Sequence, residues 1–235
     1  MCGRFAQSKT VNDLITEFVA AGGDFRDWRP SWNIAPTQTI PVLIHAATGD
    51  ATATRRLEPA RWSLTPPWSK EIKLKYPTFN ARSEGIATKA LWKGPLKTHR
   101  ALIPVDGYFE WQTFTDGTKT PHFIRHPTGE SLLLAGLYSR WKDHSKAEDD
   151  PALWTLTATI LTSDAVDELL PIHDRNPVML PETWWDRWLD PTIKGTQELV
   201  DAAVNAALPV ASSLEVFEVA KIPFKGNGPQ LIEPV

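Results

Sequence analysis

Short β-like runs dominate this sequence, and they constrain its fold more than any other feature. They are rich in β-branched and aromatic residues and are bounded by proline, glycine or polar residues: 40–45, 52–64, 101–105, 108–114, 122–125, 132–138 and 154–161. An Asp-Gly turn at 116–117 and a Pro-Thr-Gly turn at 127–129 separate three of these runs, which predicts hairpins and antiparallel pairing. A chain of many short strands favours a curved antiparallel sheet or a small barrel.

Helical patterns interrupt the strands. Apolar residues at helical spacing predict a helix over 8–21, which Gly22 and Gly23 end. Further helices are predicted over 83–93, 163–170, 181–189 and 196–207, and a last strand over 214–219. No repeat or long linker divides the chain, so we expect one domain over residues 1–235. The predicted fold class is α+β, with a curved antiparallel sheet or small barrel as the core and helices packed outside it.

Composition excludes several kinds of site. The 235 residues contain one cysteine, Cys2, which excludes internal disulfides and the multi-cysteine cages of structural zinc and iron–sulfur sites. His122 and His126 are four residues apart but lie on a predicted strand and turn, so we expect no metal site and no conventional cofactor. There is no apolar run of about 18 residues and no secretory signal pattern. We therefore expect a cytoplasmic protein that does not bind membranes.

The position of Cys2 is more informative than its number. Removal of Met1 would leave a free α-amine and a thiol on one residue, a pair that no other position in a chain offers. The reference pKa values are about 8 for the amine and about 8.5 for the thiol, so both groups are partly nucleophilic near neutrality. With an aldehyde they would form an imine and then a thiazolidine ring; alternatively, the thiol attacks an amide with the amine as base. The structural alternative is a small buried hydrophobic residue.

Two further residues are candidates for acid–base chemistry. Glu110 lies between Phe109 and Trp111 on a predicted strand, where an apolar environment would raise its pKa. Strand alternation places Tyr108 on the same face as Glu110, so the alternative is a polar face exposed to solvent. His173 follows a predicted helix and is either a proton carrier or a hydrogen-bonded structural residue.

Positive charge is concentrated between residues 70 and 100, although the whole chain has a net charge of −3. This basic window carries eight basic and two acidic residues, and Trp68, Tyr76, Phe79 and Trp92 border or interleave with it. Basic side chains combined with aromatic faces are typical of grooves that bind single-stranded nucleic acid. The alternative is a solvated surface beside aromatic residues of the core.

Six segments together resemble one protein family. They read MCGRF (1–5), WNIAPTQ (32–38), RWSLTPPW (61–68), NARSE (80–84), PVDGYFEW (104–111) and IHDRNPV (172–178). In this order they are similar to the SRAP family, the SOS response-associated peptidase or abasic-site processing proteins. Ser63 and Thr65 stand where the family often has Gly and Ile, and Asn176 stands where it usually has Met. These departures leave the reactive residues of the motifs intact.

The resemblance implies an enzyme that binds single-stranded DNA and captures abasic sites. Cys2 would form a thiazolidine crosslink with the C1′ aldehyde by way of a Schiff base, with strand cleavage by β-elimination as a lyase activity and self-processing at Met1 as a peptidase activity. The resemblance assigns catalytic roles to Cys2, Asn80, Glu110 and His173, and DNA contacts to Arg4, Asn33, Trp68, Arg82 and Arg175.

The expected partner is therefore single-stranded DNA that contains abasic sites. Replication-fork proteins are further candidate partners, and the protein would associate with the nucleoid when acting. Nothing in the sequence requires more than a monomer.

Two other classes of protein stay open on the residues alone. An N-terminal-nucleophile (class II) glutamine amidotransferase also begins with a processed Cys2, but this class gives no role to Trp68 or Glu110. A non-catalytic module that binds single-stranded DNA explains the basic window but not the terminal cysteine.

Overall fold

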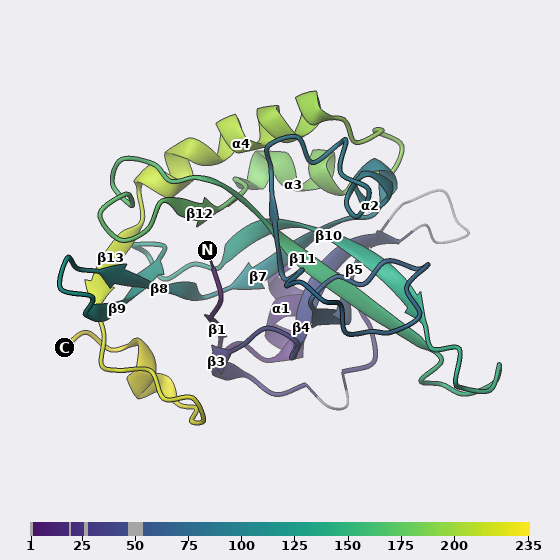
Figure 1. The fold of residues 1–235 in the computed structure, drawn as a ribbon, viewed down its shortest axis with the longest axis horizontal. Coiled ribbons are helices and arrows are strands. Elements are labelled where there is room, and N and C mark those ends of the chain that lie inside the picture. The colour runs from purple at the N-terminus through teal and green to yellow at the C-terminus, as the bar shows by residue number, and fades with distance from the viewer. Residues whose placement is uncertain (1, 19, 26–27, 47–53) are drawn as a thin grey trace.

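Five long strands close on themselves to form a barrel (Figure 1). The structure, a computed structural model, describes residues 2–18, 20–25, 28–46 and 54–235. In ring order the barrel strands are β10 (Leu132–Lys142), β7 (Arg100–Val105), β4 (Thr39–Ala46), β5 (Thr54–Trp62) and β11 (Trp154–Asp164). β11 closes the ring because it pairs with β10 on one edge and with β5 on the other. The predicted small barrel is confirmed, but the β5–β11 pairing is parallel, so the ring is mixed.

Three short strands extend the barrel sheet. β2 (Ala21–Gly22) pairs in parallel with β5, β6 (Asn80–Arg82) pairs in parallel with β11, and β12 (Arg175–Pro177) pairs antiparallel with β11. β6 and β12 come from two of the motif segments, for which the sequence predicts no strand. Both pair with the same end of β11, so two segments almost 100 residues apart become neighbours.

A second sheet packs beside the barrel and is antiparallel throughout. Its strands lie in the order β13 (Glu215–Glu218), β9 (Lys119–Arg125), β8 (Gly107–Thr113), β1 (Phe5–Gln7) and β3 (Ser31–Ile34). The predicted hairpin at 116–117 is confirmed, because β8 and β9 pair across this turn and Gly117 has a φ of 83°. The hairpin predicted at 127–129 is wrong, since the chain there crosses from β9 into β10 of the barrel.

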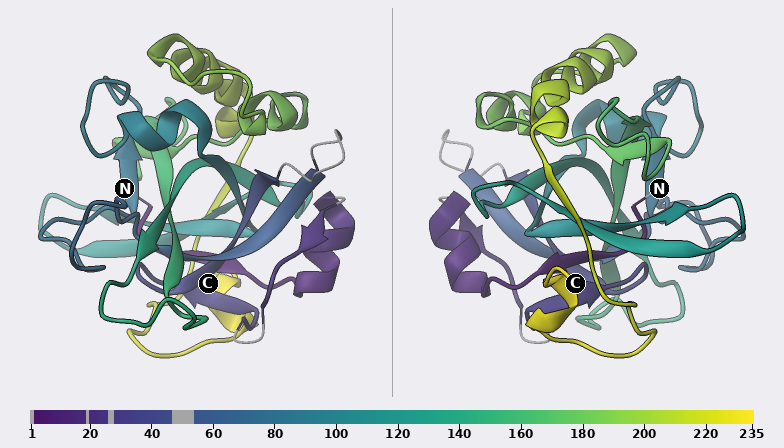
Figure 2. Two further views of the ribbon diagram at one scale, coloured as in Figure 1. Left: turned by 90° about the vertical axis from the view of Figure 1, so that its right-hand side faces the viewer. Right: turned by 90° about the vertical axis from the view of Figure 1, so that its left-hand side faces the viewer.

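Helices cover the outside of the sheets, as expected. They are α1 (Val11–Phe18), α2 (Lys93–Thr98), α3 (Glu182–Leu189) and α4 (Gln197–Ser212), with a short 3₁₀ helix at Pro229–Ile232. α1 buries Leu14 and Phe18 against the β5 side of the barrel, whereas α3 and α4 lie together elsewhere (Figure 2). Three predicted helices, 8–21, 181–189 and 196–207, are thereby confirmed in position with shifted ends.

Residue 19 of the predicted first helix and residues 52–53 of the predicted second strand lie outside the described residues. In the parts of the chain that are described, no helix has the length and apolar character to span a membrane.

Two predicted helices are wrong. The segment 83–93 forms successive turns, in which Gly85 has a φ of 63°, and helix α2 begins only at its last residue. The segment 163–170 begins as the end of β11: Ser163, expected to cap a helix, instead pairs with Asn176 of β12. Tertiary pairing therefore overrides the local helix signal at both places.

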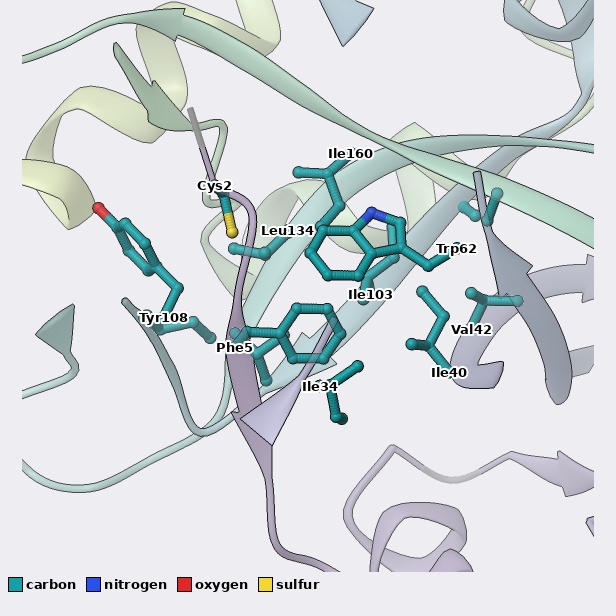
Figure 3. Packing of buried hydrophobic residues seen from close by; sticks show 14 of the residues in the cluster. Cys2, Phe5, Ile34, Ile40, Val42, Trp62, Ile103, Tyr108, Leu134 and Ile160 are labelled. Atoms are coloured by element: carbon teal, nitrogen blue, oxygen red, sulfur yellow. The ribbon is translucent and has the colours of Figure 1, made fainter. Parts of the chain in front are cut away.

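One apolar cluster joins the two sheets. Phe5 of β1 and Trp62 of β5 meet with ring centroids 4.8 Å apart, and Ile34 and Ile103 lie beside them (Figure 3). Because Phe5 belongs to the second sheet and Trp62 to the barrel, this contact docks one on the other. It also fixes the start of the chain, since Cys2 belongs to the same buried cluster.

Arg100 is the last basic residue of the basic window, but it does not belong to an exposed basic surface. Its side chain is buried and donates hydrogen bonds to five backbone carbonyls at 2.5–3.0 Å. The carbonyls belong to Leu96, Lys97, Trp188, Asp190 and Ile193, so one guanidinium satisfies the ends of α2 and α3 and the turn after α3. Arg100 therefore stabilises the fold and does not face DNA.

We expect Arg100→Met to lower the free energy of unfolding by roughly 3 kcal/mol or more, because buried carbonyls lose their donor. Denaturant unfolding measures this change. Lys97→Ala, an exposed substitution in the neighbouring helix α2, should stay within about 0.5 kcal/mol of the wild type. Equal stability of the two variants would contradict this role of Arg100.

Candidate active site

The start of the chain lies along strand β8, which carries Glu110. β1 pairs antiparallel with β8 with Phe5 opposite Tyr108, and the amide of Phe109 donates to the carbonyl of Arg4 at 2.9 Å. Continued by two residues, this register brings the backbone of residue 3 opposite Glu110. The thiol side chain of Cys2 is fully buried at this point.

Asn80 holds Cys2 from the barrel side. Its side-chain amide donates to the Cys2 carbonyl at 2.7 Å. Strand β6 positions Asn80, because it places this residue opposite Ile160 of β11. The side-chain oxygen of Asn80 is buried and has no hydrogen-bond partner among the described residues. This leaves a free acceptor beside the residue that the sequence singles out as nucleophile.

Glu110 is buried, with 4% of its surface exposed, and so is Tyr108 on the same face of β8. The alternative of a solvent-exposed polar face is therefore wrong. Burial raises the pKa of the Glu110 carboxyl, and a positive charge on His173 acts in the opposite direction. The site thus favours the protonated acid more than water does, and it places His173 close enough for its charge to act on Glu110.

The Cys2 thiol lies in the same buried environment. Its pKa is raised, mainly by burial and further by the charge of Glu110. Burial of Cys2 agrees both with a nucleophile and with the structural alternative of a small hydrophobic residue. The Glu110 carboxyl near the thiol favours the nucleophile, whereas the hydrogen bond from Asn80 reaches only the Cys2 backbone and agrees with both.

His173 lies in the turn before β12 and is partly exposed. Its Nδ1 accepts a hydrogen bond from the backbone amide of Arg175 at 3.0 Å and lies 2.7 Å from a carboxylate oxygen of Asp174. These two contacts require different protonation states of Nδ1. The amide is fixed by the backbone whereas Asp174 is exposed, so the contact with the amide is the more constrained of the two.

Cys2, Asn80, Glu110 and His173 therefore form one site from four separate segments. A hydrogen bond links Asn80 to Cys2, and charge interactions link Glu110 to Cys2 and to His173. Their catalytic roles stay predictions, but the structure brings all four together.

Arg4 and Asn33 form a pair next to this site. The Arg4 guanidinium donates to the Asn33 side-chain oxygen at 2.7 Å. Asn33 is buried, and its amide donates to the carbonyls of Pro223 and Gly226 at 3.1 and 2.8 Å. Asn33 thus uses its side chain within the protein, where it orients Arg4 and holds the C-terminal segment.

Arg175 is also engaged within the protein. Its guanidinium makes a two-pronged ion pair with Glu84 at 2.8 and 3.0 Å, and it contacts Asp164 at 2.5 Å. A further hydrogen bond of 2.7 Å runs to the carbonyl of Thr162. Two carboxylates therefore neutralise Arg175, which is 8% exposed.

Arg82 and Trp68 are the exposed members of the predicted DNA-binding set. Arg82 lies two residues after Asn80 on β6, hence on the same face of the strand. Trp68 is 72% exposed and borders a groove of about 450 Å³ that Leu91, Pro95 and Tyr138 also line. Of the other aromatic residues around the basic window, Tyr76 is exposed, whereas Trp92 is buried in the core.

Sequence reasoning did not assign a role to Tyr108. Its hydroxyl is buried and has no hydrogen-bond partner in the described part of the chain. Burial, Cys2 and Glu110 raise the pKa of this phenol well above its ordinary value. The signal was present in the sequence, since strand alternation puts Tyr108 on the face of Glu110.

Comparison with known proteins identifies the family. A family model described as SOS response associated peptidase (SRAP) matches residues 1–222. The abasic site processing protein YoaM of Bacillus subtilis is 32% identical over 99% of this chain and 98% of its own length. The abasic site processing protein YoqW of the same organism is 33% identical over 99% of both chains.

A solved structure shares the fold. The crystal structure of a protein from Bacteroides thetaiotaomicron superposes with a TM-score of 0.80 at 19% identity, over the full length of both chains. The family-model match over residues 1–222 and the 32% identity to YoaM show that the chain belongs to the SOS response associated peptidase (SRAP) family, which includes abasic site processing proteins.

Proposed function

We propose that this protein captures abasic sites in single-stranded DNA by a covalent bond from Cys2. The observation that carries the proposal is the buried Cys2 beside Glu110, held by the 2.7 Å hydrogen bond from Asn80. An abasic site is the DNA lesion that presents an aldehyde, and a 1,2-aminothiol is the group that closes a stable ring on an aldehyde. The names of the relatives support the same substrate.

The reaction begins once Met1 is removed and the Cys2 amine is free. The amine lone pair attacks C1′, and the carbonyl electron pair moves to the oxygen, which takes a proton from the Glu110 acid. This oxygen leaves as water when the imine forms, with a second proton that comes from the attacking nitrogen. The Cys2 sulfur then adds to C1′, and its proton goes to the basic group that Glu110 has become. The sum is amine, thiol and aldehyde giving thiazolidine and water.

The surrounding residues support these steps. Burial raises the pKa of Glu110, which favours the protonated acid at the point of attack more than water does. Asn80 holds the Cys2 carbonyl and offers its unpartnered oxygen to the amine. His173, which lies close enough for its charge to act on Glu110, assists opening of the sugar ring before attack.

Two side reactions belong to the same site. The imine acidifies the C2′ proton, and loss of that proton expels the 3′ phosphate by β-elimination, which is a lyase activity. Removal of Met1 is a peptide hydrolysis, and we propose that it is the extent of the peptidase activity in the family name.

DNA binding rests on phosphate contacts and aromatic faces. Arg4 and the exposed Arg82 would contact phosphates, and Trp68 would stack on bases. Asn33 contributes by orienting Arg4, and Arg175 by holding the strands that carry the site. The protein would act as a monomer in the cytoplasm, at the nucleoid, with replication-fork proteins as further partners.

Single-stranded DNA with one abasic site should give a heat-stable, shifted band with the wild type and none with undamaged DNA. Cys2→Ala should reduce this band below detection, because the thiazolidine needs the thiol. Cys2→Ala and Cys2→Ser both keep the α-amine, so each should give a stable band only when borohydride reduces the imine. An undiminished band with Cys2→Ala, or no band with wild type whose Met1 is removed, would refute the proposal.

Glu110→Gln should change how stability depends on pH. Folding raises the pKa of Glu110, so the folded protein keeps a proton that the unfolded chain releases above pH ~4.3. The free energy of unfolding of the wild type therefore falls as pH rises from this value through the pKa of Glu110 in the folded protein. The advantage of Glu110→Gln should grow over this range by about 1.4 kcal/mol for each step of one in pH and then level off.

Urea unfolding from about pH 4 to pH 8 measures this difference. Glu148→Gln is the matched control of opposite sign, since a hydrogen bond from Lys142 lowers the pKa of Glu148. If the difference in unfolding free energy between Glu110→Gln and the wild type does not vary with pH, burial leaves the pKa of Glu110 at its ordinary value.

Arg82→Ala should weaken binding to single-stranded DNA and lower the slope of log affinity against log salt by about 0.7, the value for one lost phosphate contact. Fluorescence anisotropy at several salt concentrations measures the slope. Arg187→Ala removes an exposed arginine on α3 and should leave affinity and slope unchanged. An unchanged slope for Arg82→Ala would exclude Arg82 from the phosphate contacts.

A further inference from the structure

The hydroxyl of Tyr108 is a buried hydrogen-bonding group that makes no hydrogen bond within the described part of the free protein. The side chain is 1% exposed, and the hydroxyl has no hydrogen-bond partner among the described residues. Buried polar groups are nearly always paired in native structures, so an unpaired one calls for an explanation. A phenylalanine would fill the same space, because the ring packs in the apolar cluster with Phe5 and Ile124.

The position of this hydroxyl points to the reaction site. Tyr108 lies on β8 two residues before Glu110, hence on the same face, and it pairs with Phe5 of the strand that follows Cys2. Figure 3 shows the phenol ring beside Cys2, with its oxygen directed away from Phe5 and Trp62. Tyr108 also lies close enough to Cys2 and Glu110 for their charges to raise the pKa of its phenol.

The hydroxyl also keeps its proton. Burial and the two neighbouring acidic groups raise the pKa of Tyr108 well above 10, so the phenol stays neutral over the physiological range. A neutral phenol is a hydrogen-bond donor, and among the described residues of the free protein this donor has no acceptor. The group is therefore poised to donate to an acceptor that arrives with the substrate.

We propose that Tyr108 donates a hydrogen bond to the aldehyde oxygen of the abasic site when the Cys2 amine attacks C1′. This inference rests on the proposed function. As the C–N bond forms, the carbonyl electron pair moves onto that oxygen, and a fixed donor stabilises the growing negative charge. Glu110 supplies the proton with which the oxygen leaves as water. Tyr108 gains and loses no proton, so it is an electrophilic catalyst and not a second acid.

Tyr108→Phe tests this role, because it removes one oxygen atom and keeps the ring. Under single-turnover conditions with saturating abasic DNA, we expect crosslink formation to slow by about tenfold. The deficit should be constant between about pH 6 and pH 8, since the phenol does not titrate there. Binding to DNA with a tetrahydrofuran site, which has no aldehyde, should stay within about twofold of wild type.

Stability separates this role from a structural one. Because the hydroxyl has no partner among the described residues, Tyr108→Phe should keep or raise the melting temperature. Thr159→Val is the matched control, because it removes another buried hydroxyl that has no hydrogen-bond partner among the described residues. Thr159 lies on the face of β11 opposite to Ile160, which belongs to the Cys2 cluster, so this substitution should not alter the crosslinking rate.

Three outcomes would overturn the inference: a wild-type crosslinking rate in Tyr108→Phe, a parallel loss of tetrahydrofuran-site binding, or a lowered melting temperature. Wild-type crosslinking in the same assay tests the proposed function separately. If Tyr108→Phe and the wild type form the crosslink at the same rate, only the role of Tyr108 is refuted and the proposed function stands.

Discussion

The pairing of β1 with β8 is the interaction on which the site depends. The register that places Phe5 opposite Tyr108 also brings Cys2 to Glu110. Phe5 secures this register, because its ring packs against Trp62 of the barrel at 4.8 Å. A shift of one residue would turn Phe5 away from Trp62 and toward the opposite, also buried, face of β1. The contact with Trp62 therefore selects the register, and the register positions Cys2.

Burial then gives the polar groups of the site their chemistry. Cys2, Tyr108 and Glu110 are all almost inaccessible to solvent, and burial raises the pKa of each. Burial therefore shifts the thiol, the phenol and the carboxyl group toward their neutral forms relative to water. Neutral proton donors suit attack on a carbonyl, where negative charge first appears on the substrate oxygen.

The sequence predicted the strands that are long and apolar much better than the segments that make the site. Each of the seven β-like runs matches a strand in its described residues, with ends shifted for 52–64 and 108–114, because alternation and burial are visible locally. β6 and β12 are only three residues each and exist because β11 offers them a free edge, which no local pattern reveals. The motif resemblance named Asn80 and His173, but only this pairing explains why they meet Cys2 and Glu110.

Arg82 and Arg175 show why a residue's presence in a motif does not by itself define its role. Both are arginines of short strands that flank β11, yet only Arg82 is exposed. A phosphate that approached Arg175 would meet the carboxylates of Glu84 and Asp164, which already neutralise it. Glu84 follows the strand of Asn80, and Arg175 follows His173, so this ion pair ties together the two segments that complete the site. Its loss would therefore disturb the geometry around Cys2 before it weakened any contact to DNA.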